Sequence, residues 1–301
     1  MGNGLISCCE ASSSMQDEMT ILSPRNLKSP ANRTILNEVS QIRLQCSPEF
    51  QETQKRIQTL KTLNLTSMLI IKVINSGPIV KDTRLAISHL GLEASKRLAN
   101  DGKVFFGSKR KEHGKTVNDI VIPLQKESQR DQFRGRHFVI VYNIEKDRFF
   151  IKDLGKGFGV YMRISFPIVL KDNTVINIGS SFLIFGVNED KSPILSIKIM
   201  GEESESNQFD PIDYIDDVIT LGRGITCTLR FEDTLLSKVH SYISYVGEKW
   251  ILTDGDQQKN STNGTWVYIA QETLMYSSMI FKSNQCVFQV ASASHSSEII
   301  G

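Results

Sequence analysis

The sequence predicts an all-β protein with two tandem antiparallel β-sandwiches after a mostly disordered N-terminal tail. Short segments rich in β-branched and aromatic residues are separated by Gly, Asn and Asp. No helical segments of 10–15 residues alternate with them, as a parallel sheet would require. The same order of segments then occurs twice along the 301 residues.

The tail comes first. Residues 1–62 begin with a Ser-, Asn- and Gln-rich stretch in which Ser-Pro pairs interrupt any regular pattern. Phe50, Ile57 and Leu60 are loosely spaced as on a helix, so we expect a short helix between Pro48 and Leu63.

The first repeat is expected at residues 63–190. Its strand candidates are Met68–Ile74, Lys103–Gly107, Asp119–Pro123, His137–Ile144, Arg148–Leu154, Gly159–Ile164 and Thr174–Gly179.

The second repeat is expected at residues 191–292, followed by a tail at 293–301. Its strand candidates are Ile194–Gly201, Asp217–Gly224, Cys227–Phe231, His240–Val246, Lys249–Asp254, Gly264–Ile269 and Cys286–Val290. Matched positions lie 126 residues apart at Ile71 and Ile197, and 103 apart at His137 and His240. The separation between matched positions varies little enough for loops of different length to account for it, so a duplicated domain is expected.

Composition limits the function classes. Hydrophobic residues make up 40% and charged residues 23% of the chain, which is the globular range, and a net charge of +2 gives no reason to expect nucleic-acid binding. No apolar run approaches the length of a membrane span. The five cysteines have no zinc-site spacing and no obvious disulfide pattern. We therefore expect a cytoplasmic protein without cofactors or bound metal.

Three motifs of the second repeat place polar side chains at the ends of strands. They are Gly222-Arg223, then Ser237-Lys238-Val239-His240, then Thr262-Asn263-Gly264. Arg223 and Lys238 provide cations, Ser237 and Thr262 hydroxyls, and Asn263 an amide. This set suits a phosphate dianion and the backbone of the chain that carries it.

These motifs resemble those of the forkhead-associated (FHA) domain, a β-sandwich that binds phosphothreonine. The resemblance covers about a hundred residues, from near Pro193 to near Val290. It implies that Arg223 and Ser237 bind the phosphate, with Lys238 and Thr262 beside it, and that Asn263 holds the peptide main chain. It further implies that Gly222, His240 and Gly264 support the site.

The first repeat differs from the family at the corresponding positions. Ser108 follows Gly107 where the family has Arg, Arg134 replaces the Ser of S-x-x-H, and Phe158 replaces the Asn before Gly159. This repeat therefore resembles a degenerate FHA domain. Between Lys109 and Arg136, however, basic residues outnumber acidic ones, so contact with acidic lipid or an acidic partner stays an open alternative to a solvated loop face. The basic residues are Lys109, Arg110, Lys111, Lys115, Lys126, Arg130, Arg134 and Arg136.

Catalysis is not expected. Ser237 and His240 are three residues apart, which on one strand directs them to opposite faces, and no motif places an acid to orient the histidine.

The N-terminus offers lipidation candidates. Gly2 is a candidate for N-myristoylation, and Cys8 and Cys9 for S-palmitoylation, although Ile6 stands where the usual motif has Ser or Thr.

We thus expect an adaptor at the cytoplasmic face of a membrane that recruits threonine-phosphorylated proteins, with the soluble cytosol or nucleus as alternative locations. The functional alternative is a structural assembly protein whose sandwiches make contacts that do not depend on phosphate.

Overall fold

The computed structural model describes residues 47–295 apart from 76–78, 80, 98, 123, 125–132, 188–194, 201–206 and 209–217. Its contacts divide the chain into two units, residues 1–64 and 65–301. Strands dominate and the one described helix lies in the first unit, which confirms the all-β class. That helix is not long and apolar enough to cross a membrane.

Helix α3 (Pro48–Thr62) forms where the sequence predicts a short helix. Ser47 caps its start, because the Ser47 hydroxyl accepts a hydrogen bond of 3.2 Å from the amide of Phe50. Pro48 occupies the first turn, where its missing N–H has no intrahelical partner in any case. Glu49 near the start and Lys61 near the end have the charges that the helix dipole favours.

The second unit contains an eleven-stranded sheet and two five-stranded sheets, together with a small β5–β6 hairpin. The strands group into two sandwiches that do not follow the two sequence repeats. We call them the outer and the inner sandwich, from the order of their segments along the chain.

The outer sandwich takes its strands from both ends of the unit. They are β1 (Met68–Asn75), β2 (Arg84–Ser88), β3 (Gly91–Leu92), β4 (Lys103–Gly107), β5 (Lys111–Glu112), β6 (Lys115–Thr116), β7 (Ile120–Val121), β8 (Arg136–Asn143), β9 (Arg148–Asp153), β10 (Val160–Arg163), β21 (Thr273–Leu274), β22 (Ile280–Ser283) and β23 (Cys286–Ser294).

The inner sandwich is continuous in sequence. Its strands are β11 (Ile168–Val169), β12 (Thr174–Ile178), β13 (Ser181–Val187), β14 (Leu195–Met200), β15 (Asn207–Gln208), β16 (Ile219–Gly222), β17 (Leu229–Arg230), β18 (Ser241–Val246), β19 (Lys249–Asp254) and β20 (Trp266–Tyr268).

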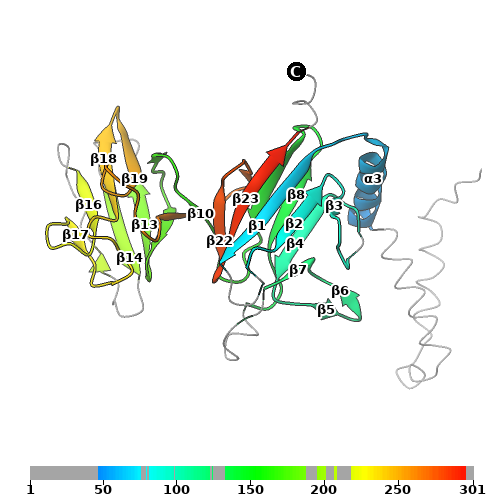
Figure 1. Cartoon of the computed structure of the whole chain (residues 1–301), viewed down its shortest axis with the longest axis horizontal. Coiled ribbons are helices and arrows are strands. Elements are labelled where there is room, and N and C mark those ends of the chain that lie inside the picture. The colour runs from blue at the N-terminus through cyan, green and yellow to red at the C-terminus, as the bar shows by residue number, and fades with distance from the viewer. Residues whose placement is uncertain are drawn as a thin grey trace, which may run out of the picture. The chain divides into compact units, whose positions relative to one another are not determined.

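The last strands of the two repeats are thus exchanged. Strand β23, from the second repeat, pairs antiparallel with β1 of the first, and β22 pairs with β10 (Figure 1). Reciprocally, β13 of the first repeat pairs with β14 of the second, and β12 pairs with β20. The short strands β11 and β21 are exchanged in the same way, pairing with β19 and β9. These pairs cross the repeat boundary expected at residues 190 and 191, so neither repeat supplies all the strands of one sandwich.

The cores show the same exchange. In the outer sandwich, the buried rings of Phe281 and Phe288, from the second repeat, pack against Phe106 and Phe138 of the first, with ring centroids 5.7–6.3 Å apart. In the inner sandwich one cluster of sixteen buried residues extends from Ile164 to Leu252, and so mixes residues of both repeats. Burial alternates along the strands, as in β1 where Leu69, Ile71 and Val73 are buried.

Candidate functional site

Three loops at one end of the inner sandwich carry the residues that the sequence motifs single out. The end of β16 lies against the segment before β18, because Arg223 donates its backbone N–H to the Ser237 carbonyl (3.1 Å) and Gly224 donates to the Lys238 carbonyl (2.9 Å). There is no space for a side chain at Gly222, because a Cβ there would lie 2.3 Å from the Lys238 carbonyl oxygen. This glycine is therefore required by the close approach of two backbones.

Arg223 is exposed and only partly engaged. Its Nε donates a 2.8 Å hydrogen bond to the Leu236 carbonyl, which fixes the guanidinium above the loop. Among the described residues neither Nη group of Arg223 has a hydrogen-bond or ion-pair partner, and the same holds for the ammonium of exposed Lys238. Two cations thus face solvent, one of them with its direction set by the backbone.

The hydroxyl and amide groups lie beside them. The Ser237 hydroxyl accepts a hydrogen bond from the Thr262 amide (3.2 Å), and the two hydroxyl oxygens are 3.5 Å apart. Asn263 donates its side-chain N–H to the Leu235 carbonyl (2.7 Å), so its own side-chain oxygen is left as an acceptor. The structure therefore brings Ser237, Thr262 and Asn263 together, and an acceptor such as Asn263 Oδ1 suits the N–H of a bound main chain.

His240 is fully buried beneath these loops and joins two of them. Its Nδ1 accepts from the Ser237 amide (3.3 Å), so the proton lies on Nε2, which donates to the Gly264 carbonyl at 3.1 Å. Burial lowers the pKa of His240, and the hydrogen bond to Gly264 opposes that change only in part. The ring is neutral and internally bonded, which fits a positioning role and gives no sign of a solvent-facing base.

Asp254 organises the loop that carries Thr262 and Asn263, and no motif pointed to it. Its carboxylate is 8% exposed and accepts four hydrogen bonds, from the amides and hydroxyls of Ser261 and Thr265, at 2.6–3.1 Å. The Ser261 hydroxyl also accepts from the Gly264 amide (2.9 Å). The only sequence signal was an Asp at the end of a strand, with Ser261 and Thr265 seven and eleven residues later, and such residues are common in ordinary turns.

The first repeat also supports this site, through residues that sequence reasoning missed. Arg163 donates to the Ser261 carbonyl (3.1 Å) and lies so close to Gly264 that a Cβ there would be 2.5 Å from its Nε. Ser180 donates its amide and hydroxyl to the Asp233 carboxylate at 2.8 and 2.9 Å, which holds the loop that leads to Ser237. The Ser180 contact exists because β12 and β13 of the first repeat complete the inner sandwich, and Arg163 reaches the site because β10 pairs with β20.

The corresponding loops of the outer sandwich have different chemistry. The Ser108 hydroxyl bridges the Phe133 carbonyl and the Gly135 amide, so it is engaged within the loop. Phe158 stacks on Phe133 with centroids 4.8 Å apart. Arg134 is exposed. This end of the outer sandwich therefore has a cation and an aromatic pair where the inner one has a serine and an asparagine.

The remaining candidates cannot be placed. Gly2, Cys8 and Cys9 lie outside the described residues, as do Lys126 and Arg130 of the basic segment. Within the described ranges no three His, Cys, Asp or Glu side chains are grouped as metal ligands.

Comparison with known proteins gives one result. A family model described as FHA domain matches residues 104–179 and 219–279, one segment in each repeat. The second matched segment contains Arg223, Ser237 and Asn263, and the first contains Ser108, Arg134 and Phe158. No curated protein matches the chain.

Proposed function

We propose that this chain, an FHA-domain protein with two FHA segments, binds threonine-phosphorylated proteins through its inner sandwich and acts as an adaptor. FHA domains generally mediate protein interactions that depend on phosphothreonine. The observation that supports the proposal best is the arrangement of Arg223, whose Nε is fixed to Leu236 while both Nη groups face solvent. A guanidinium held this way is preorganised for phosphate oxygens, and charge-assisted hydrogen bonds of this kind are the strong ones.

The neighbouring groups fit the same ligand. Lys238 supplies a second cation, the hydroxyls of Ser237 and Thr262 supply donors, and Asn263 Oδ1 supplies an acceptor for a peptide N–H. A phosphate dianion and the backbone that carries it would therefore meet complementary groups on all three loops. The proposed activity is binding, and no step of bond making or breaking is assigned to these residues.

Replacing Arg223 by Ala tests the proposal. We expect the full chain to select peptides from a degenerate phosphothreonine library, and the variant to bind the selected peptide about tenfold to a hundredfold more weakly. Folding should be unaffected because the side chain is exposed. Arg230→Ala is the matched control, since Arg230 is also exposed and also follows a buried strand residue.

Equal binding by the Arg223 and Arg230 variants would remove Arg223 from the site. Capture of the same partners before and after phosphatase treatment would favour the alternative, a structural assembly protein whose contacts do not need phosphate.

We also propose that acylation of Gly2, with palmitate on Cys8 or Cys9 as the second signal, holds the adaptor at the cytoplasmic face of a membrane. Replacing Gly2 by Ala should then move the protein from the membrane to the soluble fraction of lysed cells. Identical fractionation of the variant and the unmodified chain would contradict the anchor and leave the phosphopeptide proposal untouched.

A further inference from the structure

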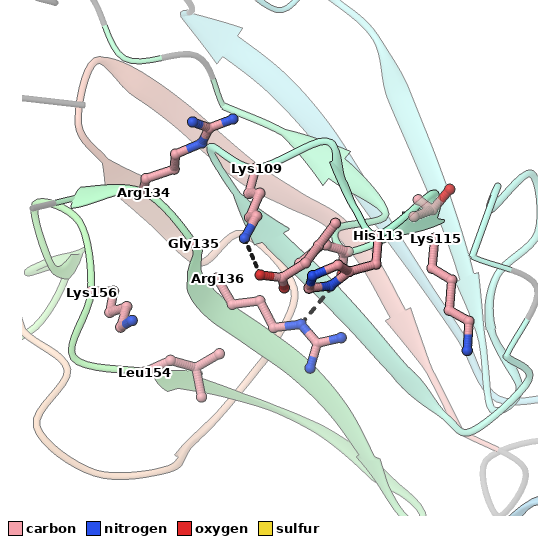
Figure 2. Close-up of a pocket in the computed structure, with 11 residues that line it drawn as sticks. Lys109, His113, Lys115, Arg134, Gly135, Arg136, Leu154 and Lys156 are labelled. Atoms are coloured by element: carbon pink, nitrogen blue, oxygen red, sulfur yellow. Dashed lines mark hydrogen bonds and ion pairs between the residues drawn. The ribbon is translucent and has the colours of Figure 1, made fainter. Parts of the chain in front are cut away.

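A cavity of about 720 Å³ lies on the outer sandwich, at the loops that correspond to the phosphopeptide site of the inner one. Its volume falls within the range of small-molecule sites, roughly 300–1,000 Å³. Cationic side chains surround it, from the β4–β5 loop, the start of β8 and the loop after β9 (Figure 2). The Lys and Arg side chains of the lining are Lys109, Lys115, Arg134, Arg136 and Lys156, and the carboxylate in the lining is Glu112.

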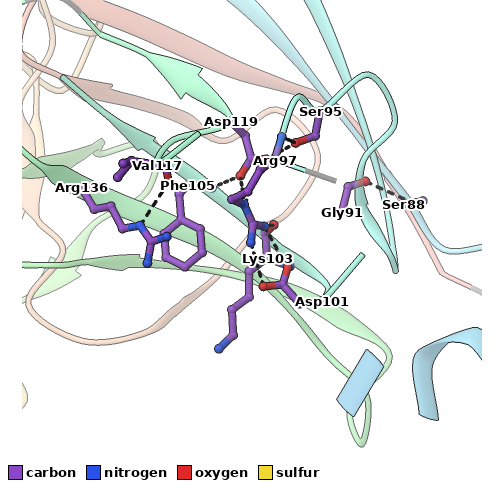
Figure 3. Close-up of polar contacts among 10 residues, drawn as sticks. All are labelled: Ser88, Gly91, Ser95, Arg97, Asp101, Lys103, Phe105, Val117, Asp119 and Arg136. Atoms are coloured by element: carbon purple, nitrogen blue, oxygen red, sulfur yellow. Dashed lines mark hydrogen bonds and ion pairs between the residues drawn. The ribbon is translucent and has the colours of Figure 1, made fainter. Parts of the chain in front are cut away.

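The nearby carboxylates are already engaged. Glu112 pairs with Lys109. Asp119 and Asp101 both bind Arg97, at 3.0 and 2.8 Å, and Figure 3 shows this buried network beside Phe105. Asp119 also accepts from the Phe105 amide (2.7 Å). These acids therefore form their ion pairs with Arg97 and Lys109.

Four cations of the lining form no ion pair among the described residues: Lys115, Arg134, Arg136 and Lys156. Arg136 lies with its guanidinium carbon 3.8 Å from the centroid of the Phe105 ring, and its Nε donates to the Val117 carbonyl (3.3 Å). Burial and the neighbouring charge of Arg97 lower the pKa of Arg136, and the carboxylates of Asp119, Asp101 and Glu112 oppose that change only in part. A fixed anion in the cavity would relieve this repulsion.

The positions of these cations are set by the fold. Arg134 and Arg136 flank Gly135, whose amide is held by the Ser108 hydroxyl. The side chain of Lys156 lies against the same glycine, since a Cβ on Gly135 would be 3.2 Å from Lys156 Cδ. Three cations from two loops are thus gathered over one short backbone segment.

The groups that would hold a peptide are missing here. Phe158 stands where the inner site has Asn263, and it stacks on Phe133. Ser108 stands where the inner site has Arg223 and is bonded within its own loop. A single phosphate dianion would also leave part of the three positive charges unbalanced. The chemistry favours a compact ligand with several phosphates over a phosphorylated peptide.

We propose that this cavity binds a ring bearing several adjacent phosphates, of the inositol phosphate class, either as a lipid headgroup or in its free form. Arg134, Arg136 and Lys156 contact the phosphates, and Lys109 contributes when the ligand competes with Glu112. This site is independent of the proposed phosphothreonine site on the inner sandwich.

The test uses the full chain at neutral pH and physiological salt. Inositol trisphosphate is titrated by calorimetry. In parallel, the protein is sedimented with vesicles that contain phosphatidylinositol bisphosphate, or phosphatidylserine at a matched surface charge. The variant is Arg134→Gln with Lys156→Gln. Its control is Arg84→Gln with Lys152→Gln, which removes two exposed cations elsewhere on the same sandwich.

We expect trisphosphate binding that the Arg134 and Lys156 substitutions weaken about tenfold to a hundredfold, and that the control pair and Arg223→Ala leave unchanged. Added sedimentation with bisphosphate vesicles identifies the lipid headgroup as a source, and trisphosphate binding alone identifies the free form. The proposal is overturned if neither probe binds, if the two double variants behave alike, or if phosphatidylserine vesicles bind equally well. It is also overturned if phosphopeptide binding survives Arg223→Ala but is lost with Arg134 and Lys156, since the cavity would then be a peptide site.

Discussion

We expect a fragment of residues 160–270 to fold alone and a fragment of residues 191–293 to remain unfolded. The first fragment contains the ten strands of the inner sandwich and all sixteen residues of its core cluster. The second, which corresponds to the second sequence repeat, lacks six of them, from Ile164 to Phe185. Loss of more than a third of a core exceeds what the small net stability of a domain tolerates.

Circular dichroism and thermal unfolding of the two fragments measure this directly. Fragment 160–270 should unfold in one cooperative transition, and fragment 191–293 should show none. Cooperative unfolding of 191–293 alone would mean that each repeat closes its own sandwich in solution. The comparison also matters for binding experiments, because the fragment that follows the sequence repeat lacks strands that support the loops of the candidate site.

Replacing Phe288 by Ala should destabilise the outer sandwich by about 3–5 kcal/mol, the usual cost of removing a buried aromatic side chain. Phe288 is fully buried and its ring lies 5.7 Å from Phe106 and 5.1 Å from Phe281. Although Phe288 belongs to the second repeat, the strands that lose protection should be those of the first. Amide hydrogen exchange identifies them.

In this variant, exchange should accelerate in β1, β4 and β8, while β16, β18 and β19 keep their protection. Phe182→Ala is the control, because the Phe182 side chain is 37% exposed and its truncation should cost far less. Faster exchange confined to β16–β19 would contradict the exchanged strands.

The sequence was sufficient for the class of fold and for most strands. Alternating apolar residues predicted β1, β8 and β19 within one or two residues, and the Ser47 cap and first-turn Pro48 are local signals that agree with α3. The pairing of the last strands of each repeat could not be predicted from the sequence. Strands β13 and β23 are equivalent parts of two similar repeats, so either one has a pattern that can complete either sandwich.

The candidate site, too, has residues that the sequence could predict and residues that it could not. Arg223, Ser237 and Asn263 belong to motifs with fixed spacing, so their proximity was predictable, and the structure brings them to one end of the inner sandwich. Arg163 and Ser180 were not predictable, because Ser180 reaches the site through exchanged strands and Arg163 through the pairing of β10 with β20. The basic segment was visible as an excess of charge. Which cations remain unpaired became clear only when Arg97 was seen to bind both Asp101 and Asp119.

Binding of phosphothreonine by the inner sandwich is tested by a calorimetric titration of the full chain with one library-selected peptide in three forms, carrying phosphothreonine, phosphoserine or unmodified threonine. We expect binding of the phosphothreonine form, weaker binding of the phosphoserine form, and no binding of the unmodified form. Equal affinity for the phosphorylated and unmodified peptides would contradict this expectation.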